Sequence, residues 1–297
     1  MTNIAPSMAE MLPFPGKLNL GVRAHDFGPG PADHLAERIA AAGFGCVQLA
    51  LNKAIAGLQL EAGDLTPSLA REIGDAFRRH GVKIAVLGCY INPIHPEMRT
   101  RARLLEFFVD HLRIARDFGC GLVALESGSV NADYSPNPAN QGSLAFHELL
   151  VSLEWVLAAA EAADVTVGLE AVVGHTVSSA TTMKRVLKTL GSRHLKVVLD
   201  PVNLLSTSLA PQHQRMLAEA VDLLGADISV VHAKDFILTD GVLQTRPAGH
   251  GQLGYGPILE FIRHQAPGLP VLLEEATEAT APGCARFLNQ RFEEIIL

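Results

Sequence analysis

The sequence lacks any uninterrupted apolar stretch of the roughly 18 residues that a membrane-spanning helix requires. Although 48% of its 297 residues are hydrophobic, charged residues or glycines divide every apolar run, so we expect a soluble protein without a membrane span. The N-terminus also lacks a basic segment followed by a long apolar core. We therefore expect no signal peptide and interpret residues 1–16 as a mobile N-terminal arm.

Basic residues are also too few, and too scattered, for a polyanion-binding surface. There are 24 Lys and Arg against 31 Asp and Glu, which gives a formal net charge of −7, and no basic block is present. Nucleic acid is therefore not an expected partner. No GxSxG elbow or Walker A sequence supports a serine hydrolase or an NTPase. Gly249, Gly251 and Gly254 spell GxGxxG, but they follow a long loop and lack an acidic ribose partner, so we expect no dinucleotide site.

Cysteine is rare, and none of the four cysteines forms a CxxC pair. They lie in or beside apolar segments at Cys46, Cys89, Cys120 and Cys284. This placement is typical of buried reduced thiols rather than of a disulfide framework or a thiolate zinc site. The cytoplasm is the expected compartment.

Strand-like and helix-like segments alternate along the chain. Strand-like runs occur at 18–22, 46–51, 83–89, 122–125, 165–169, 196–199, 228–231 and 270–273. Between them lie stretches with apolar residues at helical spacing, for example 31–43, 66–81 and 101–119. Eight such units predict an α/β fold of the (β/α)8 TIM-barrel type, formed by residues 1–297 as a single domain. A doubly wound open sheet is the alternative, but no glycine-rich phosphate turn follows the first strand.

The last four strand-like runs each end in a side chain that can bind a metal. These residues are Glu170, Asp200, His232 and Glu274, at intervals of 30, 32 and 42 residues. Because parallel strands bring their carboxyl ends to one edge, the four side chains could form one site. Three carboxylates with one imidazole suit Mn²⁺ best, with Mg²⁺ or Co²⁺ as alternatives. Each residue alone could instead be the first polar position after a strand, but four repeats weaken that interpretation.

The last strand offers two adjacent glutamates. Neighbouring strand residues point to opposite faces, so only one of Glu274 and Glu275 can face the barrel interior. We predict that Glu274 does. Glu170 and Glu274 could then approach a bound sugar from two sides.

The ordered segments VGLE, VVLDPVN, VVHAKDF and VLLEE resemble the xylose isomerase-like TIM-barrel superfamily. LGCYINPIHP, ALESGS and GHGQLGYGPI match as well, so the resemblance covers nearly the whole barrel. The sugar phosphate isomerase/epimerase group of this superfamily includes ketose 3-epimerases, hydroxypyruvate isomerases and inosose dehydratases.

The resemblance implies one divalent cation held by Glu170, Asp200, His232 and Glu274. It also implies that Glu170 and Glu274 are catalytic, one removing a proton beside a carbonyl and the other returning it through an enediolate. The expected substrate is a small ketose or related polyol, which would place the protein in carbohydrate metabolism. Barrels of this group often form dimers or tetramers, so a homo-oligomer is compatible with the resemblance.

Two positions depart from the pattern of many relatives. Gln48 stands where they have a glutamate, and Asn203 stands where they have a histidine after the metal-binding aspartate. Asn203 can hydrogen-bond a substrate hydroxyl but cannot relay a proton. These departures concern the substrate and the reaction more than the metal.

Further substrate-binding candidates each have a structural alternative. Lys234 lies two residues after His232 on the same strand face and could contact a substrate oxygen or pair with a carboxylate. Arg246, in the predicted loop QTRPAGHG, could bind a carboxylate or phosphate, or be solvated. Glu126 ends the fourth strand and could orient a ligand or pair with a neighbouring strand. His175 lies in a loop after a strand, as do His25 and His250, and any of the three could be an ordinary loop histidine.

The leading hypothesis is therefore a metal-dependent sugar isomerase or epimerase. An inosose-type dehydratase is the nearest alternative, because it shares metal and enolate chemistry but expels water. Apurinic endonucleases share the superfamily, but they have a histidine-rich, multi-zinc pattern that this chain does not match. A non-catalytic sugar-binding barrel is the remaining class.

Overall fold

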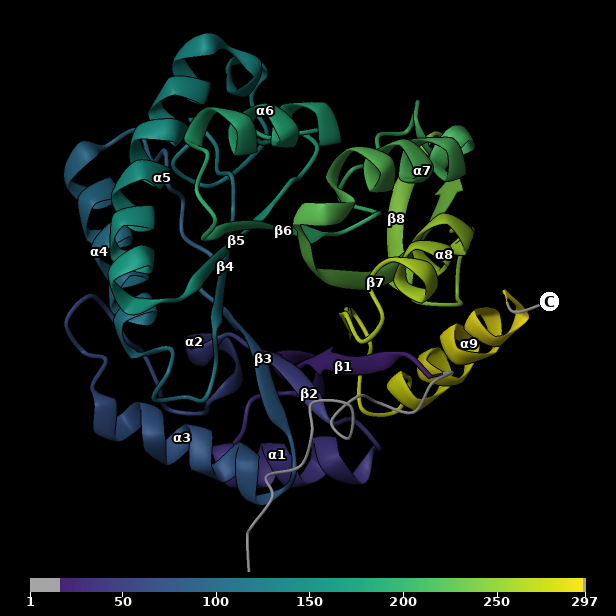
Figure 1. The fold of residues 1–297 in the computed structure, drawn as a ribbon, viewed down its shortest axis with the longest axis horizontal. Coiled ribbons are helices and arrows are strands. Elements are labelled where there is room, and N and C mark those ends of the chain that lie inside the picture. The colour runs from purple at the N-terminus through teal and green to yellow at the C-terminus, as the bar shows by residue number, and fades with distance from the viewer. Residues whose placement is uncertain (1–16, 296–297) are drawn as a thin grey trace, which may run out of the picture.

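The computed structural model describes residues 17–295, so the predicted arm at 1–16 lies outside the described residues. Eight parallel strands form a closed ring with helices outside it (Figure 1). The strands are β1 (Asn19–Arg23), β2 (Cys46–Leu49), β3 (Lys83–Gly88), β4 (Leu122–Glu126), β5 (Thr166–Glu170), β6 (Leu195–Leu199), β7 (Ile228–Thr239) and β9 (Pro270–Leu273). The ring closes because β6 pairs with β7, and β9 pairs with both β7 and β1. The predicted (β/α)8 TIM barrel is confirmed.

Helices cover the outside of the ring. They are α1 (Ala32–Ala41), α2 (Leu51–Ala54), α3 (Pro67–Arg79), α4 (Met98–Ile114), α5 (Ser143–Ala163), α6 (Ala180–Leu190), α7 (His213–Leu224), α8 (Gly256–His264) and α9 (Ala281–Glu294). Short 3-10 helices occur at Ala24–Phe27, Pro138–Gln141, Ala210–Gln212 and Gly225–Asp227. Local signals set several ends: the Thr66 side chain caps α3, Ser179 caps α6, and Gly191 ends α6 with a left-handed backbone, φ 59°.

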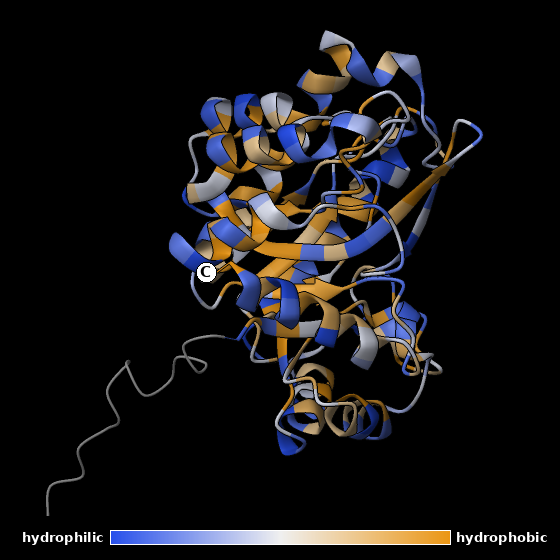
Figure 2. Ribbon diagram, turned by 90° about the vertical axis from the view of Figure 1, so that its right-hand side faces the viewer, coloured by the Kyte–Doolittle hydropathy of each residue, from blue (hydrophilic) through white to orange (hydrophobic). Residues whose placement is uncertain are grey.

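The barrel interior is filled below the carboxyl ends of its strands. A small apolar cluster that includes Cys46, Leu122, Val198 and Leu272 lies apart from the larger core between strands and helices. The strands are accordingly apolar in the ribbon view (Figure 2). Close approach requires a small residue at Gly21, where an added Cβ would lie 2.4 Å from a backbone oxygen. With the interior packed, a ligand site is confined to the strand ends.

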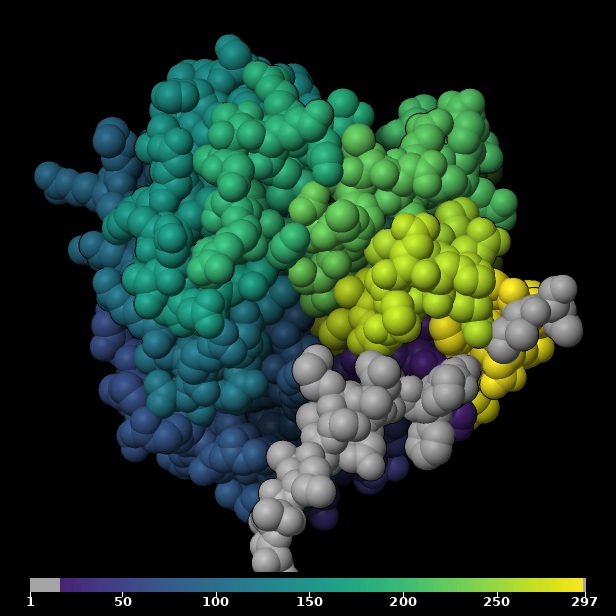
Figure 3. All heavy atoms as spheres, viewed as in Figure 1, coloured from purple at the N-terminus to yellow at the C-terminus, as the bar shows by residue number. Residues whose placement is uncertain are grey.

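The two ends of the described chain lie beside each other. β1 pairs with β9, and the space-filling view shows N-terminal segments next to the C-terminal segments in yellow (Figure 3). Closure of the ring therefore joins the first strand, which ends in Arg23, to the last, which precedes Glu274.

One hairpin was not predicted. β7 continues to Thr239, turns at Asp240 and Gly241, and returns as the antiparallel strand β8 (Val242–Pro247). Both turn residues have positive φ, 53° and 76°, as the Asp-Gly hairpin turn requires. The expectation that β7 ends at the metal-binding histidine and that Arg246 lies in a loop is wrong.

Helix α5 qualifies the expectation about membrane spans. Among the described residues it is the one helix that is long and apolar enough, by length and composition, to cross a membrane. This is weak evidence for a span, because Phe146, Leu149, Leu153 and Val156 form a buried face at helical spacing that packs on the barrel. An outer barrel helix accounts for the same composition.

Candidate metal centre

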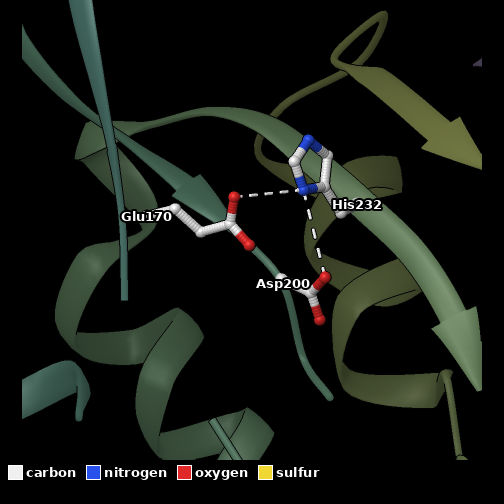
Figure 4. Close-up of side chains that lie close together, drawn as sticks. All are labelled: Glu170, Asp200 and His232. Atoms are coloured by element: carbon white, nitrogen blue, oxygen red, sulfur yellow. Dashed lines mark ion pairs between the residues drawn. The ribbon is translucent and has the colours of Figure 1, made fainter. Parts of the chain in front are cut away.

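The four predicted ligands converge at the carboxyl end of the barrel. Glu170 ends β5, Asp200 follows β6, His232 lies within β7 and Glu274 follows β9. All four side chains are buried. Figure 4 shows the carboxylates of Glu170 and Asp200 lying toward the same nitrogen of the His232 ring.

His232 Nδ1 is the centre of this cluster. It lies 3.5 Å from Glu170 Oε2, 3.9 Å from Asp200 Oδ2 and 3.1 Å from Glu274 Oε1. One candidate ligand atom from each of Glu170, Asp200 and His232 lies within 4.8 Å of the others. Glu274 is not part of this group of three, although its Oε1 is the nearest of the three carboxylate oxygens to Nδ1, and its Oε2 accepts a hydrogen bond from Lys234.

The cluster fits a divalent cation. His232 Nδ1 is fully buried but has no hydrogen-bond partner, and a buried polar atom without a partner is destabilising. Burial lowers the pKa of His232, but the carboxylates of Glu274 and Glu170 outweigh it and raise that pKa to about 9. Such a concentration of negative charge around one nitrogen is what a cation would neutralise, and oxygen with nitrogen donors suits a hard or borderline ion.

Gln48 fixes the orientation of the His232 ring. Its Oε1 lies 2.8 Å from His232 Nε2, while its Nε2 donates to the Tyr90 hydroxyl at 2.6 Å. Because an amide oxygen only accepts hydrogen bonds, Nε2 of His232 carries the hydrogen and Nδ1 is turned toward the carboxylates. Gln48, noted from the sequence as a departure, is therefore well suited to support a neutral metal-binding histidine.

Lys234 pairs with the carboxylates of the cluster. Its Nζ lies 2.9 Å from Asp200 Oδ2 and 3.0 Å from Glu274 Oε2. Burial lowers the pKa of Lys234, but Asp200 and Glu274 raise it above its ordinary value. Of the two sequence-based alternatives for Lys234, the carboxylate pair is the one that the structure contains. The side chain also lines the cavity described below, so it remains accessible to a ligand.

Glu274 and Glu275 have different surroundings, as expected for adjacent residues whose side chains point to opposite faces. Glu274 contacts His232 and Lys234, and its Oε2 lies 3.3 Å from Arg23 Nη1. Burial would raise the pKa of Glu274, but His232, Lys234 and Arg23 lower it to about 2. Glu275 instead accepts a hydrogen bond from Thr245 on β8. Only Glu274 therefore reaches the metal-binding cluster.

A cavity of about 570 Å³ opens above the cluster. Two of the predicted metal ligands, Glu170 and Glu274, lie in its wall together with Lys234. The remaining lining residues come from the ends and following loops of β1 to β6 and are Arg23, His25, Lys53, Tyr90, Glu126, Tyr134, Val172, His175 and Asn203. This is space for a small polar molecule such as a monosaccharide.

Glu126 and His175 form one wall of the cavity. Glu126 stands in register with Glu170 on the adjacent strand, and its Oε2 lies 3.3 Å from His175 Nδ1. Burial, reinforced by the charge of Glu170, raises the pKa of Glu126 to about 8. Burial lowers the pKa of His175, whose ring meets the edge of Tyr134 at 4.7 Å. Burial and the charge of Glu170 thus both favour the protonated form of Glu126.

The remaining predicted contact residues divide into two groups. Asn203 donates to Glu170 Oε1 at 2.6 Å and lines the cavity. Arg246 lies on β8, where it donates to the Thr245 carbonyl and to Gln244, and it is not among the residues lining the cavity. The structure therefore brings Asn203, but not Arg246, to the site.

Sequence reasoning missed part of this cavity. Arg23 ends β1 in the same way that Glu170 ends β5, but the first strand was predicted to stop one residue earlier. Tyr90 follows β3 within a segment already noted for its resemblance, and Lys53 lies on α2 directly after β2. Applying the strand-end rule to all eight strands would have found Arg23.

Comparison with known families identifies the fold. The family model of the xylose isomerase-like TIM barrel matches residues 36–290, and the chain belongs to this family. No curated protein sequence gives a significant match.

Many solved structures are similar to this chain, at low sequence identity. A D-tagatose 3-epimerase-like protein has 18% identity and a TM-score of 0.70, covering 93% of this chain and 97% of its own. The 3-keto-D-glucoside 4-epimerase of E. coli has 15% identity and a TM-score of 0.68, with coverages of 92% and 98%. A xylose isomerase-like TIM barrel protein from Mycobacterium smegmatis, crystallised with magnesium, has 13% identity and a TM-score of 0.66, with coverages of 98% and 100%. These similarities establish the shared fold.

Proposed function

We propose that this protein is a divalent-metal-dependent isomerase or epimerase of a small ketose or related polyol. The observation that carries the proposal is the convergence of Glu170, Asp200, His232 and Glu274 at the base of a sugar-sized cavity. Similarity to a D-tagatose 3-epimerase-like protein, a D-psicose 3-epimerase and an L-ribulose 3-epimerase supports the same class of reaction.

The cation would be held by these four residues, with Mn²⁺ as the first candidate. Bound there, it would polarise a substrate carbonyl and lower the barrier to removal of the neighbouring C–H proton. Similar folds have been crystallised with zinc and with magnesium, which supports a divalent ion as the kind of cofactor.

Glu170 and Glu274 are the proposed proton-transfer groups. One carboxylate takes the proton from the carbon beside the carbonyl, and the electron pair of that C–H bond moves toward oxygen to form an enediolate. The other, after it takes a proton from solvent, returns it to the opposite face, which inverts the carbon, or to the adjacent carbon, which moves the carbonyl. Lys234 and Arg23 keep Glu274 ionised, and Asn203 orients Glu170 through its 2.6 Å hydrogen bond.

Glu126 supports dehydration as a second candidate reaction. A buried carboxylic acid with a pKa of about 8 could protonate a departing hydroxyl after the same proton abstraction by Glu170. An inosose-type dehydratase would produce an unsaturated or diketo product, which ultraviolet absorption detects, whereas an epimerase would not.

Solvent exchange tests the proposed function. Protein reconstituted with Mn²⁺ is incubated in D₂O with D-fructose, D-tagatose and D-ribulose, and deuterium at carbon is measured by NMR. We expect incorporation at one carbon beside the carbonyl, abolished in Glu170→Gln and retained in Glu219→Gln, an exposed substitution on α7. Metal-loaded protein that exchanges no carbon-bound proton in any ketose would refute the proposal.

A further inference from the structure

The cavity has a basic side, of which the proposed reaction uses Arg23 alone, to keep Glu274 ionised. Arg23 at the end of β1, His25 in the following turn and Lys53 on α2 all line it. A neutral sugar needs no such group, because its hydroxyls are bound by neutral donors and acceptors as well as by charges.

Three cationic side chains line the cavity, Arg23, Lys53 and Lys234, and they differ in their ion-pair partners. Arg23 pairs with Asp26 at 2.9 Å and with Glu274 at 3.3 Å, and Lys234 pairs with Asp200 and Glu274. Within residues 17–295, Lys53 Nζ forms no ion pair with a carboxylate within 4.0 Å, and it lies 5.4 Å from the centre of the Tyr90 ring. Lys53 is exposed to solvent, and because Tyr90 also lines the cavity, its ammonium group lies at the cavity wall without a carboxylate partner among the described residues.

His25 adds a neutral donor beside this charge. Its Nδ1 is buried and has no hydrogen-bond partner, while its Nε2 lies 3.9 Å from Asp26. Burial, and then the charges of Arg23 and Lys53, lower the pKa of His25 to about 4. At neutral pH the ring is uncharged, and Nε2, the ring nitrogen that is not enclosed, can donate one hydrogen bond to a ligand that Lys53 attracts.

We propose that Lys53, assisted by His25, binds a carboxylate of the substrate, so that the substrate is a keto sugar acid rather than a neutral sugar. This inference rests on the proposed function for the sugar part of the molecule. The ammonium of Lys53, which has no carboxylate partner among the described residues, and the neutral N–H of His25 together match the single charge of a carboxylate. A phosphate dianion normally meets more donors, and the guanidinium of Arg23 is already engaged by Asp26 and Glu274.

Three ligands that differ at one carbon test the inference. D-fructuronate, D-fructose and D-fructose 6-phosphate carry a carboxylate, a hydroxymethyl and a phosphate group at that carbon. Their dissociation constants are measured by titration calorimetry on Mn²⁺-loaded protein, in the wild type and in Lys53→Met, Lys53→Arg and Lys188→Met. Lys188→Met removes the same charge from the outer helix α6.

We expect wild-type protein to bind fructuronate roughly tenfold or more tightly than fructose, because one charge-assisted hydrogen bond is at stake. Lys53→Met should remove this preference, Lys53→Arg should keep most of it, and Lys188→Met should leave it within about twofold. Raising the salt concentration from roughly 0.05 to 0.5 M should shrink the preference in the wild type, which tests the charge without any substitution.

Equal binding of the acid and the neutral sugar, or a preference that survives Lys53→Met, would overturn the inference. A preference for the phosphate alone, lost in Lys53→Met, would overturn the carboxylate assignment. The two experiments separate failure of this inference from failure of the proposed function. Deuterium exchange without a preference for the acid would contradict only the role of Lys53. A preference for the acid without deuterium exchange would contradict only the proposed reaction.

Discussion

Replacing Gln48 by leucine should weaken both the fold and metal binding. Gln48 is fully buried and joins His232 Nε2 to the Tyr90 hydroxyl through hydrogen bonds of 2.8 and 2.6 Å. Leucine has a similar volume but makes neither bond, so the buried Nε2 of His232 loses its partner, whereas the Tyr90 side chain lines the cavity and is only half-buried. One such buried loss costs about 1–3 kcal/mol, and we expect the free energy of unfolding to fall by about that amount.

The same substitution releases the His232 ring from its orientation. Loss of a hydrogen bond that orients a metal-binding histidine typically lowers metal affinity about 10–100-fold. Urea unfolding of the metal-free protein and Mn²⁺ titration measure the two effects separately. Gln290→Leu, on the exposed face of α9, is the matched control. A Gln48→Leu protein with wild-type Mn²⁺ affinity would refute the role assigned to Nδ1 of His232.

Three further predictions concern the charges of the cluster. Lys234→Met should destabilise the metal-free protein by about 3–5 kcal/mol, because Asp200 and Glu274 lose their buried counter-ion. Mn²⁺ should therefore raise the melting temperature of Lys234→Met more than that of the wild type. Equal shifts in melting temperature would contradict this. Because the pKa of His232 is about 9 in the metal-free protein, the ring is charged at pH 7 and must lose a proton to bind a cation. The affinity for Mn²⁺ should therefore rise with pH, and the binding enthalpy measured by calorimetry should depend on the buffer. A binding enthalpy that is the same in every buffer would contradict this proton release. The pKa of Glu274 is lowered from 4.5 to about 2 on folding, so its contribution to stability is present above about pH 4.5 and is lost as pH falls toward 2. The difference in unfolding free energy between the wild type and Glu274→Gln should shrink over that pH range. A difference that stays constant with pH would contradict this.

The barrel itself was predictable because its signals are local. Each strand is a short apolar run, and each helix repeats apolar residues at helical spacing, so eight units can be counted without knowing any long-range contact. The β7–β8 hairpin was not found, although Asp240-Gly241 is a strong turn signal. The short alternation of β8, with mostly half-exposed residues, does not resemble a buried barrel strand.

The sequence predicts the site residues that directly follow apolar strand runs, but not the contacts that they make. Glu170, Asp200, His232 and Glu274 each directly follow a buried apolar run, and parallel topology then brings them together. Which atoms meet depends on contacts between residues distant in sequence, such as Gln48 with His232. Arg246 shows the limit of the approach: its residue type suits an anion, but the hairpin that carries it lies outside the cavity wall.

The central claim is that these four side chains hold one divalent cation through Nδ1 of His232. Anomalous diffraction from crystals soaked in Mn²⁺, recorded at the manganese absorption edge, tests it most directly. The structure predicts a single peak about 2.0–2.4 Å from His232 Nδ1 and from carboxylate oxygens of Glu170, Asp200 and Glu274. The absence of a peak between these residues, or a peak at any other position, would contradict the account.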